Sequence, residues 1–165
     1  MYKFILDADA LIKLTKSGIL EDVCHHYTCI ITTEIKNECV DEGKKRLYKD
    51  ALKIEEFINK NLLKIIDFKK ARKIKENLGK GETSTASLYF QEKNSIVVTD
   101  DSAFIKYLEE NNIKFFVPAD LILLMKISNK IDKKTALNYL DKMKGFIKKE
   151  AYDDVKKDIK EDLKW

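Results

Sequence analysis

The sequence lacks several features that would place it in a specialised class of protein. No apolar run approaches the roughly 18–20 residues of a membrane-spanning helix, so we expect no membrane association. The opening segment meets an acid at Asp7, too early for a secretion signal. The three cysteines, at positions 24, 29 and 39, are odd in number and do not make a disulfide framework. These absences predict a soluble cytoplasmic protein.

Arginine is also scarce, because almost all of the positive charge is lysine. The chain has 32 Lys and Arg against 28 Asp and Glu, and only Arg46 and Arg72 are arginines. The resulting +4 is compatible with a polyanionic partner but does not imply one. With 165 residues, 44% of them hydrophobic, the chain can fill the core of a single domain. The function must therefore be sought in particular carboxylates rather than in the total charge.

Short apolar runs alternate with segments of helical periodicity. The runs predict strands at Tyr2–Leu6, Thr28–Thr32, Leu63–Asp67, Ser95–Thr99 and Ile113–Val117. The periodic segments predict helices at Ala8–Ser17, Thr33–Asp41, Lys45–Asn59, Lys70–Leu78, Glu82–Gln91 and Ser102–Glu110. We expect Gly18, Gly43 and Gly79 to end three of these helices. The alternation predicts an α/β fold of three layers, with a central parallel sheet and right-handed crossovers.

From Ala119 onward the pattern is helical throughout, at about residues 119–128, 132–146 and 150–163. The last helix carries an apolar stripe, typical of a core or docking face, made of Tyr152, Val155, Ile159 and Leu163. We expect residues 1–130 to form the main domain. Residues 131–165 are then C-terminal helices that pack on the same domain or extend it.

Acidic residues gather where the predicted strands end. They are Asp7 and Asp9 after the first strand, Glu38 in the helix after the second, Glu82 at the start of a helix after Gly79-Lys80-Gly81, and Asp100 and Asp101 after the most hydrophobic strand. In a parallel α/β sheet the functional crevice lies beyond the carboxyl ends of the strands. Four separate segments are therefore expected to bring acids to one edge of the sheet.

Several carboxylates in one place repel one another, and their pKa values rise unless a cation neutralises them. Such oxygen ligands suit Mg²⁺ or Mn²⁺. An ion held there can generate hydroxide for attack on a phosphodiester and stabilise the leaving oxygen. The pattern thus predicts a metal-dependent site for phosphoryl chemistry. Each acid alone also fits a simpler role, such as a helix cap at Asp7 or a favourable charge in the first helical turn at Asp9 and Glu82.

The same segments carry four motifs in a fixed order. FILDADALIKL places Asp7 after a strand and a second acid two residues later, and Thr32, Ile35 and Glu38 fit a "T…V…E" helix pattern. GETSTASLY opens a helix rich in small residues with an acid, and VVTDDSAF ends a strand with Thr, then the acid pair. Over about residues 2–130 the order and spacing resemble the PIN-domain family of metal-dependent ribonucleases, which includes the toxins of VapC-type toxin–antitoxin pairs.

The resemblance implies a role for each matched residue. Asp7, Glu38, Glu82 and Asp101 would be the catalytic, metal-binding acids, with Asp100 as a further metal-binding acid and Asp9 as an auxiliary. Thr99 would be a hydroxyl that orients a carboxylate or a water, and Lys80 is the lysine best placed for a phosphate contact. The implied cofactor is Mg²⁺ or Mn²⁺, and the implied partners are RNA, a protein antitoxin and a second copy in a homodimer. The helical tail is longer than a minimal domain of this kind needs.

Two other interpretations fit part of the pattern. In a haloacid dehalogenase-type phosphatase, Asp7 would be a covalent nucleophile and Asp9 a general acid. That family usually has Gly where this chain has Ala10, and the interpretation leaves Glu38 and Glu82 without a role. The other alternative is a PIN-fold binding module without catalysis, which failure of the acids to bind metal would favour.

Overall fold

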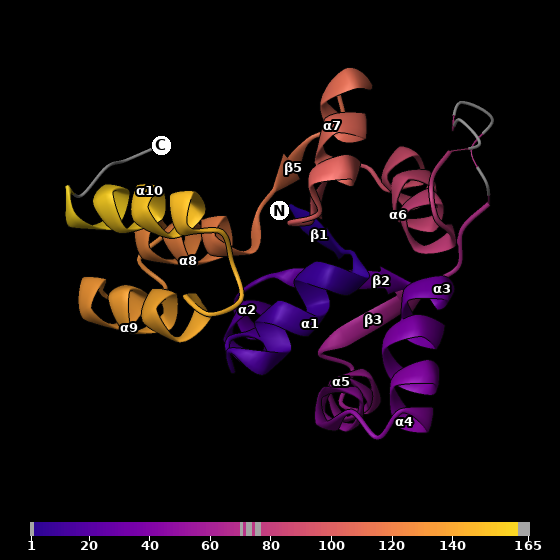
Figure 1. Cartoon of the computed structure of the whole chain (residues 1–165), viewed down its shortest axis with the longest axis horizontal. Helices are drawn as coiled ribbons and strands as arrows, with labels where there is room; N and C mark the ends of the chain where they lie inside the picture. Colours follow the sequence, from indigo (N-terminus) through magenta and orange to yellow (C-terminus); the bar gives the residue numbers. More distant parts are fainter. Residues whose placement is uncertain (1, 70, 72–73, 75–76, 162–165) are drawn as a thin grey trace.

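Five short strands form one fully parallel sheet at the centre of the molecule (Figure 1). The computed structural model describes residues 2–69, 71, 74 and 77–161. The strands are β1 (Lys3–Leu6), β2 (Thr28–Thr32), β3 (Leu63–Ile66), β4 (Ser95–Val98) and β5 (Phe115–Phe116). Their order in the sheet is β3-β2-β1-β4-β5. The predicted α/β class with a central parallel sheet is confirmed.

The sheet is covered on both faces because each strand is apolar at successive positions. Phe4 and Leu6 pack into the larger hydrophobic cluster, whereas Ile5 between them points into a smaller cluster on the opposite face. The larger cluster lies under the helices α1 (Ala8–Lys16), α2 (Leu20–His26), α5 (Lys49–Asn59) and α8 (Pro118–Ile127). The opposite face is covered by α6 (Lys80–Gln91) and α7 (Ser102–Glu110). Continuous apolar strands of this kind are typical of buried parallel sheets.

Two further helices, α9 (Lys133–Met143) and α10 (Lys149–Lys160), pack against α8 and against each other (Figure 1). The expected stripe on α10 is buried at Tyr152, Val155 and Ile159, and these side chains belong to the same hydrophobic cluster as Phe4. Leu163 lies outside the described residues. Within the described part of the chain, no helix is both long and apolar enough to cross a membrane.

The segment after β2 departs from its prediction. The helix begins as α3 (Thr33–Lys36), widens into the π-helix η1 (Asn37–Glu42) and continues as α4 (Gly43–Lys45). Gly43 therefore does not end the helix at Asp41, as was predicted. Its φ of −61° is ordinary helical backbone, and a Cβ atom there would lie 2.9 Å from the Cβ of Ala51. Gly43 thus permits close packing of α4 on α5. The turn before α5 comes later instead, with Leu47 at φ 60°.

Other boundaries also differ. Helix α2 was not predicted, and the expected strand Ile113–Val117 is reduced to Phe115–Phe116, because only these residues pair with β4. The expected helix Lys70–Leu78 falls largely on residues outside the described ones, and Ala71 and Ile74 within it are not helical. Gly18, in contrast, ends α1 as predicted, with φ 72°.

The strand order creates one point where the direction of winding reverses. From β1 the chain moves outward through β2 to β3, and it then returns to the other side of β1 to form β4 and β5. In the register between the two central strands, Leu6 lies beside Val98. The residues that follow β1 and β4 therefore emerge side by side, at the place where α/β proteins most often bind their ligands.

Candidate active site

Asp7 lies at the base of a cavity where β1 ends and α1 begins. It is the N-cap residue of α1, and its Oδ1 accepts a hydrogen bond of 2.8 Å from the backbone N–H of Ala10. Only 5% of the residue is exposed. Because β1 ends directly before α1 begins, the same Asp7 side chain both caps the helix and lines the cavity.

The buried position of Asp7 makes the charged form of its carboxyl group less favourable. Burial raises its pKa from 3.8 to about 7. Hydrogen bonds with Thr99 and with the Ala10 N–H oppose that rise, while the nearby charges of Asp9 and Asp101 add to it. A buried acid with its pKa shifted so far, in a cleft among other acids, is typical of a functional site.

The three residues after β4 point in different directions. The Thr99 hydroxyl is buried and accepts a hydrogen bond of 3.2 Å from the N–H of Asp101. It therefore connects Asp101 with Asp7. Asp101 is the N-cap of α7, with Oδ1 accepting a bond of 2.7 Å from the Phe104 N–H, and it also lines the cavity. Asp100 does not line the cavity, because its side chain is turned inward and pairs with Lys13.

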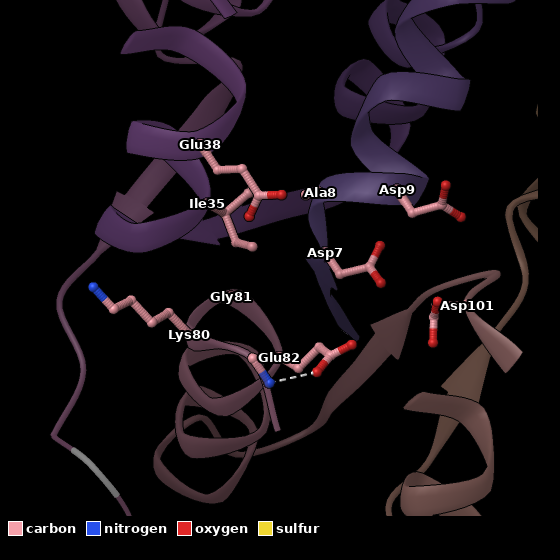
Figure 2. Close-up of a pocket in the computed structure, with 10 residues that line it drawn as sticks. Asp7, Ala8, Asp9, Ile35, Glu38, Lys80, Gly81, Glu82 and Asp101 are labelled. Atoms are coloured by element: carbon pink, nitrogen blue, oxygen red, sulfur yellow. Dashed lines mark hydrogen bonds between the residues drawn. The ribbon is translucent and has the colours of Figure 1, made fainter. Parts of the chain in front are cut away.

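Glu38 reaches the cavity from the π-helix η1, on the opposite wall from Asp101 (Figure 2). π-Helical turns inside α-helices are frequent at functional sites. A close approach of α6 supports this arrangement: a Cβ atom at Gly81 would lie 3.0 Å from Oε2 of Glu38 and 3.1 Å from Cδ1 of Ile35. Glycine at position 81 thus lets the Glu38 carboxylate lie directly against the start of α6.

Glu82 sits in the first turn of α6. Its Oε2 accepts a hydrogen bond of 2.7 Å from the N–H of Gly79, the residue before the helix. A second set of bonds fixes this helix end against β2, since Ser84 donates to the Gly81 carbonyl at 2.7 Å and shares a 2.7 Å hydrogen bond with Thr32. Lys80 lines the cavity, but Figure 2 shows its ammonium group extending away from the carboxylates.

These segments enclose a cavity of about 390 Å³. Of the residues predicted for the site, the cavity brings together Asp7, Asp9, Glu38, Lys80, Glu82 and Asp101 (Figure 2). Thr99 is hydrogen-bonded to Asp7. Asp100 is linked to Asp9 by the ammonium group of Lys13, which contacts both carboxylates. Among the described residues, no three Asp, Glu, His or Cys side chains converge closely enough to ligate one ion together.

The donor chemistry of the cavity fits a hard divalent cation. All of its acidic groups are carboxylates from separate segments, and such oxygen ligands suit Mg²⁺ and Mn²⁺. The volume far exceeds the ~30 Å³ share of one water molecule, so an ion would have room for bound waters. The raised pKa of Asp7 points the same way, because a nearby cation would favour its charged form.

Sequence reasoning did not single out Lys13 or Gly81. Lys13 lies four residues after Asp9 on α1, a spacing that places two side chains together on a helix. The spacing therefore indicates the pair of Lys13 with Asp9, but the second partner of Lys13, Asp100, is 87 residues away in the sequence. Gly81 stood in a recognised motif, yet its contact with Glu38 depends on how α6 packs against η1.

The chain is similar to known proteins over most of its length. The family model DUF3368, described as a PIN domain, matches residues 3–161. A solved structure of a PilT N-terminus domain protein, SSO1118, from the hyperthermophilic archaeon Sulfolobus solfataricus P2 is similar to the chain, with a TM-score of 0.48 and 16% identity, covering 72% of this chain and 89% of that one. No curated protein matches. Because the family model extends from the first strand to the last helix, this chain belongs to the PIN-domain family, whose members are typically nucleases that use divalent metal ions.

Proposed function

We propose that this protein is a metal-dependent ribonuclease that hydrolyses phosphodiester bonds of RNA. The observation that carries the proposal is the convergence of Asp7, Glu38, Glu82 and Asp101 on one cavity. They come from four segments far apart in the sequence, and the cavity lies where the winding of the sheet reverses. Family membership adds that this fold is generally a nuclease fold.

The four acids differ in how firmly the backbone holds them. One oxygen each of Asp7, Glu82 and Asp101 accepts a hydrogen bond from a backbone N–H at the start of a helix. These bonds fix the orientation of three carboxylates before any ligand arrives. Groups fixed in this way need little reorganisation when charge develops during a reaction. Glu38, which is exposed, is positioned instead by the contact of its carboxylate with α6.

We propose Mg²⁺ or Mn²⁺ as the cofactor, bound among these four carboxylates by one or two of them directly and by waters that complete its coordination. When bound, such an ion lowers the pKa of a coordinated water and offsets negative charge on a phosphodiester. The Thr99 hydroxyl is hydrogen-bonded to Asp7 and to the backbone N–H of Asp101, and it therefore fixes the position of these two acids relative to each other. The cavity wall is negative, so an RNA backbone needs cations to approach it, and the exposed Lys80, which lines the cavity, can supply a positive charge.

The test is cleavage of a labelled single-stranded RNA with Mn²⁺, with and without a chelator. Asp7→Asn is the decisive variant, and Asp132→Asn is its matched control. Asp132 is also an N-cap aspartate bonded to the backbone N–H three residues on, but at α9 and outside the cavity. Asparagine is a good cap, so both variants are expected to fold.

We expect chelator to stop cleavage and Asp7→Asn to slow it at least ~100-fold, since each lost 1.36 kcal/mol of transition-state stabilisation is tenfold in rate. Asp132→Asn should cut at the wild-type rate. Cleavage that survives both chelator and Asp7→Asn would refute the proposal. Binding of RNA without cleavage in any divalent ion would favour the binding module instead.

A further inference from the structure

Lys13 is held between two carboxylates next to the cavity. Its Nζ lies 2.8 Å from Oδ2 of Asp9, one helical turn earlier on α1, and 2.8 Å from Oδ2 of Asp100, after β4. A single ammonium group on α1 therefore joins this helix to the segment that follows β4. Two contacts of this length are charge-assisted hydrogen bonds.

The two acids need this cation to different degrees. The side chain of Asp100 is 3% exposed, whereas that of Asp9 is 41% exposed and that of Lys13 is 20% exposed. Burying a charge is costly unless a partner offsets it, so the more buried Asp100 depends more on Lys13 than Asp9 does. Burial lowers the pKa of Lys13, but the hydrogen bonds with Asp100 and Asp9 outweigh it and the pKa is raised. Lys13 therefore remains charged at neutral pH.

Lys13 also divides the acids of this region into two groups. Six carboxylates lie in or directly behind the cavity, and two of them, Asp9 and Asp100, are bonded to Lys13. The other four belong to the proposed metal-binding set. Two-metal nuclease sites need ions ~3.5–4 Å apart with carboxylates for both. Here two of the six carboxylates, Asp9 and Asp100, already hold an ammonium group.

We infer that Lys13 is a fixed cation in the place of a second divalent ion, so that this site binds one metal ion and not two. The inference rests on the proposed function, because it assumes that the other four acids hold metal. Lys13 is a positioning residue here: it acts through Asp9 and Asp100 and does not line the cavity itself. A fixed cation keeps these two acids neutralised at any metal concentration.

The test counts bound Mn²⁺ ions per chain, from the electron paramagnetic resonance signal of free Mn²⁺ during a titration. The proteins compared are the wild type, Lys13→Gln, Lys13→Met and Lys13→Arg. Glutamine can still donate a hydrogen bond but carries no charge, while methionine removes both functions. Arginine is the matched control because it keeps the positive charge.

We expect one ion per chain in the wild type and in Lys13→Arg, and two in Lys13→Gln and Lys13→Met. If the neutral variants are unfolded without metal, circular dichroism should show that Mn²⁺ refolds them, with two ions bound. An equal count in wild type and folded neutral variants, or neutral variants that Mn²⁺ does not refold, would overturn the inference. A wild type that binds no Mn²⁺ contradicts the proposed function itself, so the two failures are distinguishable.

Discussion

Replacing the buried acid Asp7 by asparagine should make the metal-free protein more stable while it abolishes activity. The folded state raises the pKa of Asp7 from 3.8 to about 7. The folded protein therefore binds this proton more tightly than the unfolded chain does. Stability from this group is fully present below pH 3.8 and is lost as the pH rises to about 7. At neutral pH and above, the charged carboxylate of Asp7 destabilises the folded state relative to the unfolded chain.

The size of the effect follows from the shift. A pKa difference of about 3 units, at 1.36 kcal/mol per unit, corresponds to about 4 kcal/mol near pH 8. An asparagine amide keeps the bond from Ala10 but must itself be buried, which reduces the gain to about 1–3 kcal/mol. At ~2–4 °C per kcal/mol for a chain of this length, we expect Tm to rise by about 2–12 °C.

The assay is thermal unfolding in the presence of chelator at several pH values. The gain in Tm of Asp7→Asn over the wild type should be largest near pH 8 and should more than halve by about pH 5. Mn²⁺ should raise the Tm of the wild type and leave that of Asp7→Asn almost unchanged. In the control Asp132→Asn, the gain should be absent at every pH, because that acid is exposed. An Asp7→Asn protein less stable than the wild type at pH 8 would refute the reasoning.

Three further substitutions test other parts of the structure. Gly81→Ala should push the Glu38 carboxylate away from α6, because the new Cβ would lie 3.0 Å from Oε2, and we expect Mn²⁺ affinity measured by calorimetry to fall ~10-fold; unchanged affinity would contradict this role. Asp101→Ala should lose activity and also ~1 kcal/mol of stability in denaturant unfolding, whereas Asp101→Asn should lose activity alone because asparagine still caps α7. Ile159→Ala should lower the unfolding free energy by ~2–5 kcal/mol, and a loss below ~0.5 kcal/mol would mean that α10 is not part of the core.

The central strands could be predicted closely because burial on both faces leaves a plain signal. β1, β2 and β4 are apolar or β-branched at nearly every position, and their observed bounds differ from the predicted ones by at most one residue. Edge strand β5 was overestimated, since the apolar character of Ile113–Val117 reflects packing beyond its two paired residues. Helix α2 was missed, although Leu20, Val23 and Cys24 have the spacing of a buried helical face.

The site could be predicted as a set of acids but not as a geometry. The rule that strand ends meet at one edge gathered the six acids, and the family resemblance singled out Asp7, Glu38, Glu82 and Asp101, which line one cavity. The strand-end rule could not separate Asp101 from Asp100, because adjacent residues share the same sequence signal and only the turn decides which one faces the cavity. It also gave no reason to notice Lys13 among so many lysines, since its partners meet only in the folded sheet.

The pairing of β1 with β4 has a consequence for the order of events during synthesis. About ninety residues separate these strands, since Lys3 pairs with Ser95. A nascent chain that has released only β1 to β3 holds Asp7 and Glu38 but lacks Thr99 and Asp101. The cavity can form only after β4 has left the ribosome and paired with β1. We therefore expect the proposed nuclease activity to be absent until more than half of the chain has been translated, while the chain is still attached to the ribosome.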